Sequence, residues 1–270
     1  MLNVTWWRSP EGMNNLGDEI TSALLENYFK ISHVKTNIFN ADLISTGSIL
    51  NWVYNRDNWE PGRRRLAVVG SGLMKPIANI EKKNKANEFL DIHSVRGYLT
   101  KSLLGTKGND VTIGDPGLLA SFLVSSKPVK KFKFGLIPHH SKVNDQEFIE
   151  KFSQLDSVRI IDFRTNDYND VFTKMLECDI ILSQSLHGLI FSDSLSIPNV
   201  WIDAGTLHGG GEFKFYDYFS SVGRDFSQKL DVSKMPLNSE MIQDRKVHEM
   251  SKIKLHKIQE DIIDAFSKVI

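Results

Sequence analysis

Short apolar runs alternate with helical patterns along most of this sequence, and this alternation constrains the fold more than any other feature. Candidate strands lie at residues 2–7, 41–44, 65–69, 93–96, 111–113, 132–138, 158–163, 179–183 and 199–202. Candidate helices lie at residues 17–29, 98–104, 145–155, 170–177 and 186–195. Strands that alternate with helices form parallel sheets covered on both faces. The pattern therefore predicts an α/β protein.

A polar, lysine-rich stretch at residues 125–133 separates two such series. We expect two Rossmann-like halves that face a cleft, residues 1–127 and residues 128–235. Apolar residues at spacings of three and four predict that residues 236–270 form a C-terminal helix packing back on the body. Ligands of open parallel sheets bind at the carboxyl ends of the strands, so the loops there are the candidate sites.

Composition excludes several classes of function. Lys plus Arg total 33 and Asp plus Glu total 33, and this balance argues against a nucleic-acid binder. The single cysteine, Cys178, rules out an internal disulfide, and the scattered histidines predict no metal site. The N-terminus does not resemble a signal peptide, and no apolar run is long enough to span a bilayer. We therefore expect a soluble, cytoplasmic protein.

The most informative segment is Ser183-Gln184-Ser185-Leu186-His187-Gly188, which follows an apolar strand. The start of a helix there offers N–H groups and a dipole that favour phosphate or carboxylate. His187 can donate a hydrogen bond or a proton near neutral pH. The alternative is that a serine caps the helix and His187 packs in the core. The residues by themselves leave both interpretations open.

Residues 181–193, followed by Ile197-Pro198-Asn199-Val200, closely resemble the C-terminal signature of polysaccharide pyruvyltransferases. Five further segments agree in order and spacing: Asn15-Leu16-Gly17-Asp18, Ser45-Thr46-Gly47-Ser48, Ser94-Val95-Arg96-Gly97, Gly114-Asp115-Pro116 and Pro138-His139-His140. The resemblance implies a fold like that of GT-B glycosyltransferases. It also implies transfer of the enolpyruvyl unit of phosphoenolpyruvate to a sugar as a cyclic ketal, with release of phosphate. The first half would bind the acceptor and the second half phosphoenolpyruvate.

This chemistry assigns expected roles to individual residues. The carboxylate and phosphate of phosphoenolpyruvate need cations and oriented N–H donors, and Arg96 is the candidate bidentate clamp. Protonation of the methylene carbon and attack by a sugar hydroxyl need an acid and a base. His187 is the candidate acid or phosphate partner, and His139 is a second imidazole. Asp18 is expected to accept a proton from an acceptor hydroxyl or to orient that hydroxyl, unless it only stabilises its helix start.

One position departs from the family pattern. Many members carry an Arg before the Leu-His pair, where this chain has Ser185. Lys214 and Arg224 are candidates for the missing positive charge. The other expected substrate-binding residues lie in the motifs above or in the loop after residues 65–69: Ser183, Ser185, Leu186, Asn15, Gly17, Gly47, Ser48, Ser71 and Gly72. Their glycines either let backbone approach a ligand or only supply turn geometry.

Several alternatives remain open at this level. A glycosyltransferase using a nucleotide sugar and a non-catalytic glycan-binding relative both fit the expected fold. Gly70-x-Gly72 lacks the third glycine of a dinucleotide fingerprint, so no cofactor is expected besides the donor substrate. Residues 208–211 are expected to form a mobile loop over the cleft.

A cluster of aromatic residues and arginines predicts either an acceptor surface or a contact with anionic lipid headgroups, unless the arginines only form a solvated face. The cluster consists of Trp52, Tyr54, Trp59 and the three arginines at residues 63–65. A lipid-linked acceptor would bring the protein to the inner face of the cytoplasmic membrane.

Overall fold

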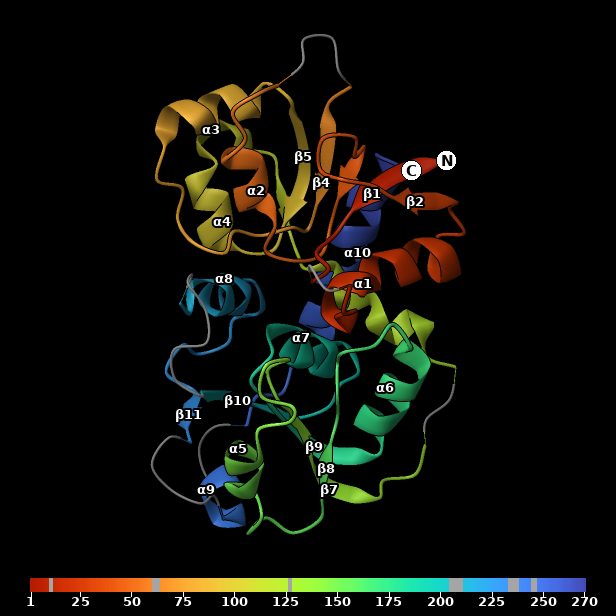
Figure 1. The fold of residues 1–270 in the computed structure, drawn as a ribbon, viewed down its shortest axis with the longest axis vertical. Helices are drawn as coiled ribbons and strands as arrows, with labels where there is room; N and C mark the ends of the chain where they lie inside the picture. The colour runs from red at the N-terminus through yellow and green to blue at the C-terminus, as the bar shows by residue number, and fades with distance from the viewer. Residues whose placement is uncertain (10–11, 60–63, 126–127, 204–210, 233–237, 244–246) are drawn as a thin grey trace.

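The computed structural model of the chain describes residues 1–9, 12–59, 64–125, 128–203, 211–232, 238–243 and 247–270. It contains two parallel sheets, stacked one above the other in Figure 1, with helices around and between them. The expected α/β class is confirmed.

The first sheet has the strand order β2-β1-β3-β4-β5-β6, and every neighbouring pair is parallel. Its strands are β1 (Leu2–Thr5), β2 (His33–Lys35), β3 (Leu43–Ile44), β4 (Leu66–Val69), β5 (Leu90–Val95) and β6 (Thr112–Ile113). All four residues of β4 are buried, as expected for a central parallel strand covered on both faces. The sequence did not predict β2, an edge strand whose side chains are partly or fully exposed.

The helical segments of this half are α1 (Leu16–Ala23), α2 (Leu50–Tyr54), α3 (Ile80–Asn87) and α4 (Tyr98–Leu103), with short turns η1 (Leu24–Tyr28), η2 (Gly105–Gly108) and η3 (Pro116–Leu123). The single helix expected at residues 17–29 is therefore an α-helix followed by a π-helical turn. Asp115 begins η3, since its side chain accepts a hydrogen bond from Gly117 N and Pro116 starts the turn.

The second sheet has the order β11-β10-β9-β7-β8 and is also entirely parallel. Its strands are β7 (Phe132–Ile137), β8 (Val158–Ile160), β9 (Cys178–Ser183), β10 (Asn199–Asp203) and β11 (Lys229–Asp231). The remaining helices are α5 (Gln146–Glu150), α6 (Tyr168–Leu176), α7 (Leu186–Ser194), α8 (Phe213–Val222), α9 (Ser239–Gln243) and α10 (Lys252–Ser267).

One apolar cluster joins the two halves. It contains Val4 of the first sheet and Ile181 of the second, together with residues of α1, η3, α7 and α10. Helix α10 returns from the end of the chain to the first half. There Ile258 and Ile262 pack against Gly114, where a Cβ atom would come within 2.8 Å of either side chain. The shared core fixes the two sheets relative to each other; the domain bounds given above stay a prediction.

Some expectations concern the surface. Tyr54 and Trp59 are buried in the core of the first half, so of the three aromatic residues proposed as a surface cluster only Trp52 is exposed. The loop expected over the cleft lies outside the described residues at positions 208–210, and so does Arg63. No helix in the described part of the chain is long and apolar enough to cross a membrane.

Candidate active site

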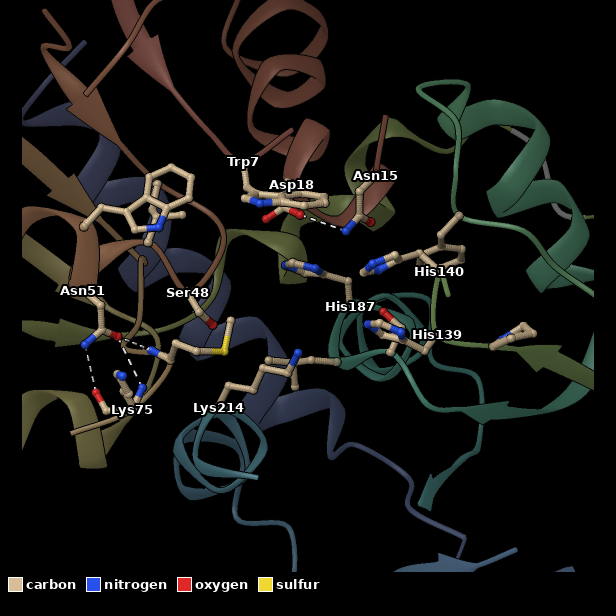
Figure 2. A pocket seen from close by; sticks show the side chains of 17 residues that line it. Trp7, Asn15, Asp18, Ser48, Asn51, Lys75, His139, His140, His187 and Lys214 are labelled. Carbon is tan, nitrogen blue, oxygen red and sulfur yellow. Dashed lines mark hydrogen bonds between the residues drawn. The ribbon is translucent and has the colours of Figure 1, made fainter. Parts of the chain in front are cut away.

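A cavity of about 390 Å³ lies where the carboxyl ends of both sheets meet. Figure 2 shows Ser48, Asn51 and Lys75 at one side of it, His139 and His140 at the other, and Asp18 and His187 between them. The cavity is lined by Trp7, Asn15, Asp18, Ser48, Ile49, Asn51, Trp52, Met74, Lys75, Pro138, His139, His140, Phe163, Ser185, Leu186, His187 and Lys214. Both series of strand-end loops therefore supply its wall, as parallel sheets predict.

The start of α1 places one carboxylate in this wall. Asn15 caps the helix, since its Oδ1 accepts a hydrogen bond from Gly17 N at 3.2 Å. Its Nδ2 donates to Asp18 Oδ2 at 2.9 Å. The helix start is tied to the second half, because Leu16 N donates to Phe163 O at 2.9 Å. Asn15 thus both begins the helix and orients the Asp18 side chain.

Burial gives the Asp18 carboxyl an unusual acidity. Removal from water raises its pKa from 3.8 to about 7, with smaller contributions from Glu19 and Asp115, while Lys214 acts in the opposite direction. The side chain therefore titrates near neutral pH instead of in the acid range. A carboxyl group with a pKa near the working pH is suited to give or take a proton.

The turn from β9 into α7 also lines the cavity. Ser183 is fully buried, and its Oγ accepts from Ser185 N at 3.1 Å and donates to Ser185 O at 2.8 Å. The Ser185 side chain makes no capping hydrogen bond to α7, so neither serine caps that helix. Ser183 shapes the turn, whereas Ser185 and Leu186 face the cavity. The first turn of α7, where N–H groups have no partner within the helix, therefore lies at the cavity wall.

His187 reaches from this turn toward α1. Its ring lies against Gly17, where a Cβ atom would come within 2.0 Å of His187 Nδ1. Its Nε2 is buried and has no hydrogen-bond partner among the described residues. Burial lowers the pKa of His187 from 6.5 to about 3, and the charges of Lys214 and Arg96 act in the same direction. The imidazole is thus neutral at physiological pH.

Two lysines bring positive charge to the cavity. Lys214, at the start of α8, has its pKa lowered from 10.5 to about 8, first by burial and then by Arg96, while Asp18 opposes the shift. It remains mostly charged at neutral pH. Lys75 follows β4 and is exposed at the wall. Asn51 holds that loop, because its Oδ1 accepts from Met74 N at 2.6 Å and its Nδ2 donates to Lys75 O at 3.1 Å.

The loop after β7 contributes two further imidazoles. His139 is buried; its backbone N donates to Gln184 Oε1 at 3.1 Å, and its Nδ1 lies 2.8 Å from Ser141 Oγ. The His140 ring lies 3.9 Å from that of His139 and 5.9 Å from that of Trp7, measured between centroids. Burial, Lys214 and Arg164 lower the pKa of His140.

Arg96 lies behind the wall instead of in it. Its guanidinium is fully buried, forms an ion pair with Asp217 at 3.0 Å and donates to Ser48 Oγ at 2.5 Å. Gly72 makes room for it, because a Cβ atom there would come within 2.3 Å of Arg96 Cζ. Arg96 was expected to bind the substrate directly. Its N–H groups instead donate to protein groups, and Ser48 lies between it and the cavity.

The other glycine-rich loop has a similar supporting role. Gly47 adopts φ = 106°, which favours glycine, and a Cβ atom there would come within 2.7 Å of Asp18 Oδ1. Ser71 Oγ and Gly72 N both donate to Gly47 O at 3.0 Å. These residues do not line the cavity. They create the space that Asp18 and Arg96 occupy.

Arg224 lies outside the cavity. It is buried against the second sheet, where it donates to Asn199 Oδ1 at 2.6 Å and packs over Phe219 with its Cζ 4.7 Å from the ring centroid. Asn199 in turn donates to Asp193. Lys214, and not Arg224, is therefore the one of the two candidate cations that the structure brings to the cavity.

The structure brings together about half of the residues expected at the site. The expected residues that line the cavity are Asp18, Asn15, Ser48, His139, Ser185, Leu186, His187 and Lys214. Those that do not line it are Gly17, Gly47, Ser71, Gly72, Arg96, Ser183 and Arg224. No motif pointed to Trp7, Asn51, Met74 or Phe163. Each of them lies after a strand or near the start of a helix, at the carboxyl ends of the strands. This position in the sequence is the signal by which such residues could be predicted.

In this two-sheet α/β protein a carboxyl, imidazoles and lysines gather where the strand ends of both sheets meet. Residues 15–205 match the sequence pattern of the family described as polysaccharide pyruvyl transferase, and the chain belongs to this family. The family resemblance of its motifs is thereby confirmed.

Two curated relatives match the chain. It is 33% identical over 172 residues to the uncharacterized protein L143 of Acanthamoeba polyphaga mimivirus, covering 61% of this chain and 58% of that protein. It is 25% identical over 219 residues to the succinoglycan biosynthesis protein ExoV of Rhizobium meliloti (strain 1021), covering 81% of this chain and 64% of that protein. The matches thus span about three fifths of each relative. No solved structure matches the chain significantly.

Proposed function

We propose that this chain transfers the pyruvyl group of phosphoenolpyruvate to a sugar of a polysaccharide or of its precursor, releasing phosphate. Membership of the family supports pyruvyl transfer as the reaction class. The observation that carries the proposal is the meeting of Asp18, His187 and Lys214 in one cavity between the two sheets. The same proposal includes a GT-B-like arrangement of the two halves, phosphoenolpyruvate as the donor and a cyclic ketal as the product.

The donor site in this proposal lies at the first turn of α7. The N–H groups there and the helix dipole favour the phosphate of phosphoenolpyruvate, and Lys214 adds a full positive charge. Neutral His187 supplies a hydrogen bond from a buried ring nitrogen that lacks a partner among the described residues. Lys214 thereby takes the place of the Arg that many family members carry before the Leu-His pair.

Asp18 donates and accepts the transferred proton in this proposal. In its protonated form it donates to the methylene carbon of phosphoenolpyruvate, which creates an oxocarbenium-like carbon. A sugar hydroxyl adds to that carbon, phosphate leaves with the electron pair of the C–O bond, and a second hydroxyl closes the ketal while its proton passes to the departing phosphate. The Asp18 carboxylate left by the first step accepts a proton from an attacking hydroxyl. Its pKa of about 7 fits both roles, whereas that of His187 is too low for a proton donor.

The acceptor occupies the first-half wall in this proposal. Trp52 lines the cavity with 42% of its surface exposed, while its neighbours Val53 and Tyr54 on α2 are buried. An indole face left open beside a polar cavity suits the apolar face of a sugar ring. Replacing Trp52 with Ala should raise the KM for the acceptor about tenfold and leave the KM for phosphoenolpyruvate unchanged, as steady-state kinetics with each substrate varied will show.

The direct test is incubation of the protein with phosphoenolpyruvate and a panel of free, nucleotide-linked and lipid-linked saccharides. The expected result is phosphate release together with an acceptor mass gain equal to a pyruvyl ketal. His187→Ala should slow both, and Lys254→Met on helix α10 should leave both unchanged. Absence of phosphate release across the panel, with stabilisation of the protein by a nucleotide sugar, would instead identify a glycosyltransferase.

A further inference from the structure

Helix α8 belongs to the second half by sequence but docks on the first. It packs against α4, and the contact is close because a Cβ atom at Gly97 would come within 1.8 Å of Asp217 O. Tyr98 N donates to Ser220 Oγ at 3.0 Å across the same contact. Figure 1 shows α8 beside the lower end of α4, between the two sheets. The helix that carries Lys214 is therefore anchored to the opposite half of the molecule.

Asp217 is the centre of this contact. It has no exposed surface, and every one of its described side-chain partners comes from the first half. Its Oδ1 accepts from Thr100 N at 2.7 Å, and its Oδ2 accepts from Thr100 Oγ1 at 2.7 Å and from Arg96 Nε at 3.0 Å. The positive charge of Arg96 is thus balanced by a carboxylate from the other half. A buried arginine without such a partner is strongly destabilising.

Arg96 links Asp217 to a residue that lines the cavity. Its Nη1 donates to Ser48 Oγ at 2.5 Å, and its Nη2 donates to Leu73 O at 2.7 Å. A serine hydroxyl has one proton to donate, and here its oxygen already accepts from a charged donor. The Ser48 proton has no acceptor among the described residues, and Ser48 lines the cavity. The hydroxyl is therefore set to donate to a ligand oxygen.

Lys214 lies one helical turn before Asp217 on α8 and also lines the cavity. The same carboxylate therefore anchors two groups on different walls, Ser48 through Arg96 and Lys214 through the helix. Thr100 adds a further tie, since its Oγ1 accepts from Leu73 N at 3.1 Å while donating to Asp217.

We propose that Asp217 is a positioning residue, which through Arg96 holds the Ser48 hydroxyl as a hydrogen-bond donor to the bound substrate and fixes Lys214 at the same cavity. The catalytic part of this inference rests on the proposed function. The structural part, the link from α8 to the loops after β3 and β4, does not.

The structural part is tested by amide hydrogen exchange in the full chain. Asp217→Asn places an N–H₂ group against one of two donors, Arg96 Nε or Thr100 N, and should speed exchange at least about tenfold in peptides covering residues 45–51 and 71–76. Peptides from the core of the second sheet should be unaffected. Ser220→Ala, which removes the hydrogen bond to Tyr98 at the same contact, is the matched control and should leave both loops as protected as in the wild type.

The catalytic part is tested with a variant expected to fold. Arg96→Met combined with Asp217→Leu removes both charges. Replacing both partners of a buried ion pair with apolar residues often preserves the stability of the protein. This double variant and Ser48→Ala should each lower kcat/KM about 10- to 100-fold, and the triple variant should be no worse than the double.

Each outcome decides the proposal. Faster loop exchange in Asp217→Asn, together with the non-additive loss of kcat/KM, supports it. Unchanged exchange, a double variant with wild-type kcat/KM, or additive losses in the triple variant overturn it. If the wild type does not turn over phosphoenolpyruvate, the proposed function fails, and the exchange result alone decides whether Asp217 anchors the two loops.

Discussion

At the scale of single residues, the cavity depends on ionisable side chains whose acidities are set by burial. Asp18 has its pKa raised to about 7 and His187 has its pKa lowered to about 3, so the carboxyl and not the imidazole titrates near neutrality. The sequence could place both residues near a helix start. It could not rank them as proton donors, because the shift depends on removal from water in the folded state.

Replacing Asp18 with Asn should lower kcat about 100- to 10,000-fold, because the amide cannot transfer a proton. If the protonated carboxyl is the active form, wild-type kcat/KM should fall as the pH rises above about 7. A pH–rate profile of both proteins checks this. A wild-type profile that stays flat from pH 6 to pH 9 would exclude Asp18 as the proton donor.

The same substitution should stabilise the protein at alkaline pH. The raised pKa means that the folded state retains a proton that the unfolded chain loses between about pH 4 and pH 7, so the contribution of Asp18 to stability falls across this window. The amide of the Asp18→Asn variant does not ionise and avoids this loss, worth up to about 4 kcal/mol at pH 8. Denaturant unfolding at pH 4 and pH 8 will show a gain at the higher pH only; a gain at both would point to another cause.

At the scale of elements, a glycine at the start of α1 and another in the loop after β4 leave space for side chains from other segments. Gly17 faces His187, and Gly72 faces Arg96. The motifs around these glycines predicted either the close approach of a ligand or turn geometry, because a motif indicates that space is needed but not what fills it.

Gly17→Ala should displace the His187 ring, since the new methyl group would overlap Nδ1. We expect a loss of about 1–3 kcal/mol of stability from overpacking, with a much larger loss of activity than of folded protein. Thermal unfolding and kcat measured on the same preparation check this.

The control for this variant is Gly12→Ala, which loses stability for a different reason. Gly12 has φ = 80°, so a side chain there strains the backbone by about 1–2 kcal/mol, yet no atom in the described chain lies within 4 Å of the added methyl group. The control should therefore lose stability and keep its kcat. Equal losses of kcat in the two variants would contradict a specific effect on His187.

The strands with continuous apolar runs could be predicted because burial on both faces requires that pattern. β2 and β11 could not, because each has three residues and lies at a sheet edge. Helix α8 was missed as well, since residues 213–219 are dominated by aromatic side chains. The partner of Arg96 could not be predicted either, because Asp217 lies 121 residues away in the sequence.

At the scale of the whole molecule, a continuous apolar core joins the two halves, and α10 contributes side chains to it. Ile262 of α10 is fully buried, and its side chain meets Gly114 of the first half. Ile262→Ala should lower the free energy of unfolding by about 2–5 kcal/mol. Because the core is shared, both halves should still unfold in one transition. Calorimetry that resolved two transitions in the wild type would contradict a single joined core.

The central claim is that the cavity between the two sheets binds phosphoenolpyruvate through Lys214 and the start of α7. Isothermal titration of phosphoenolpyruvate into the wild type, Lys214→Met and the α10 control Lys254→Met tests it directly. We predict one site in the wild type, binding at least about tenfold weaker in Lys214→Met, and unchanged binding in Lys254→Met. Affinity in the wild type should also decline above pH 8, as Lys214 loses its proton. Equal affinities in all three proteins would contradict the claim.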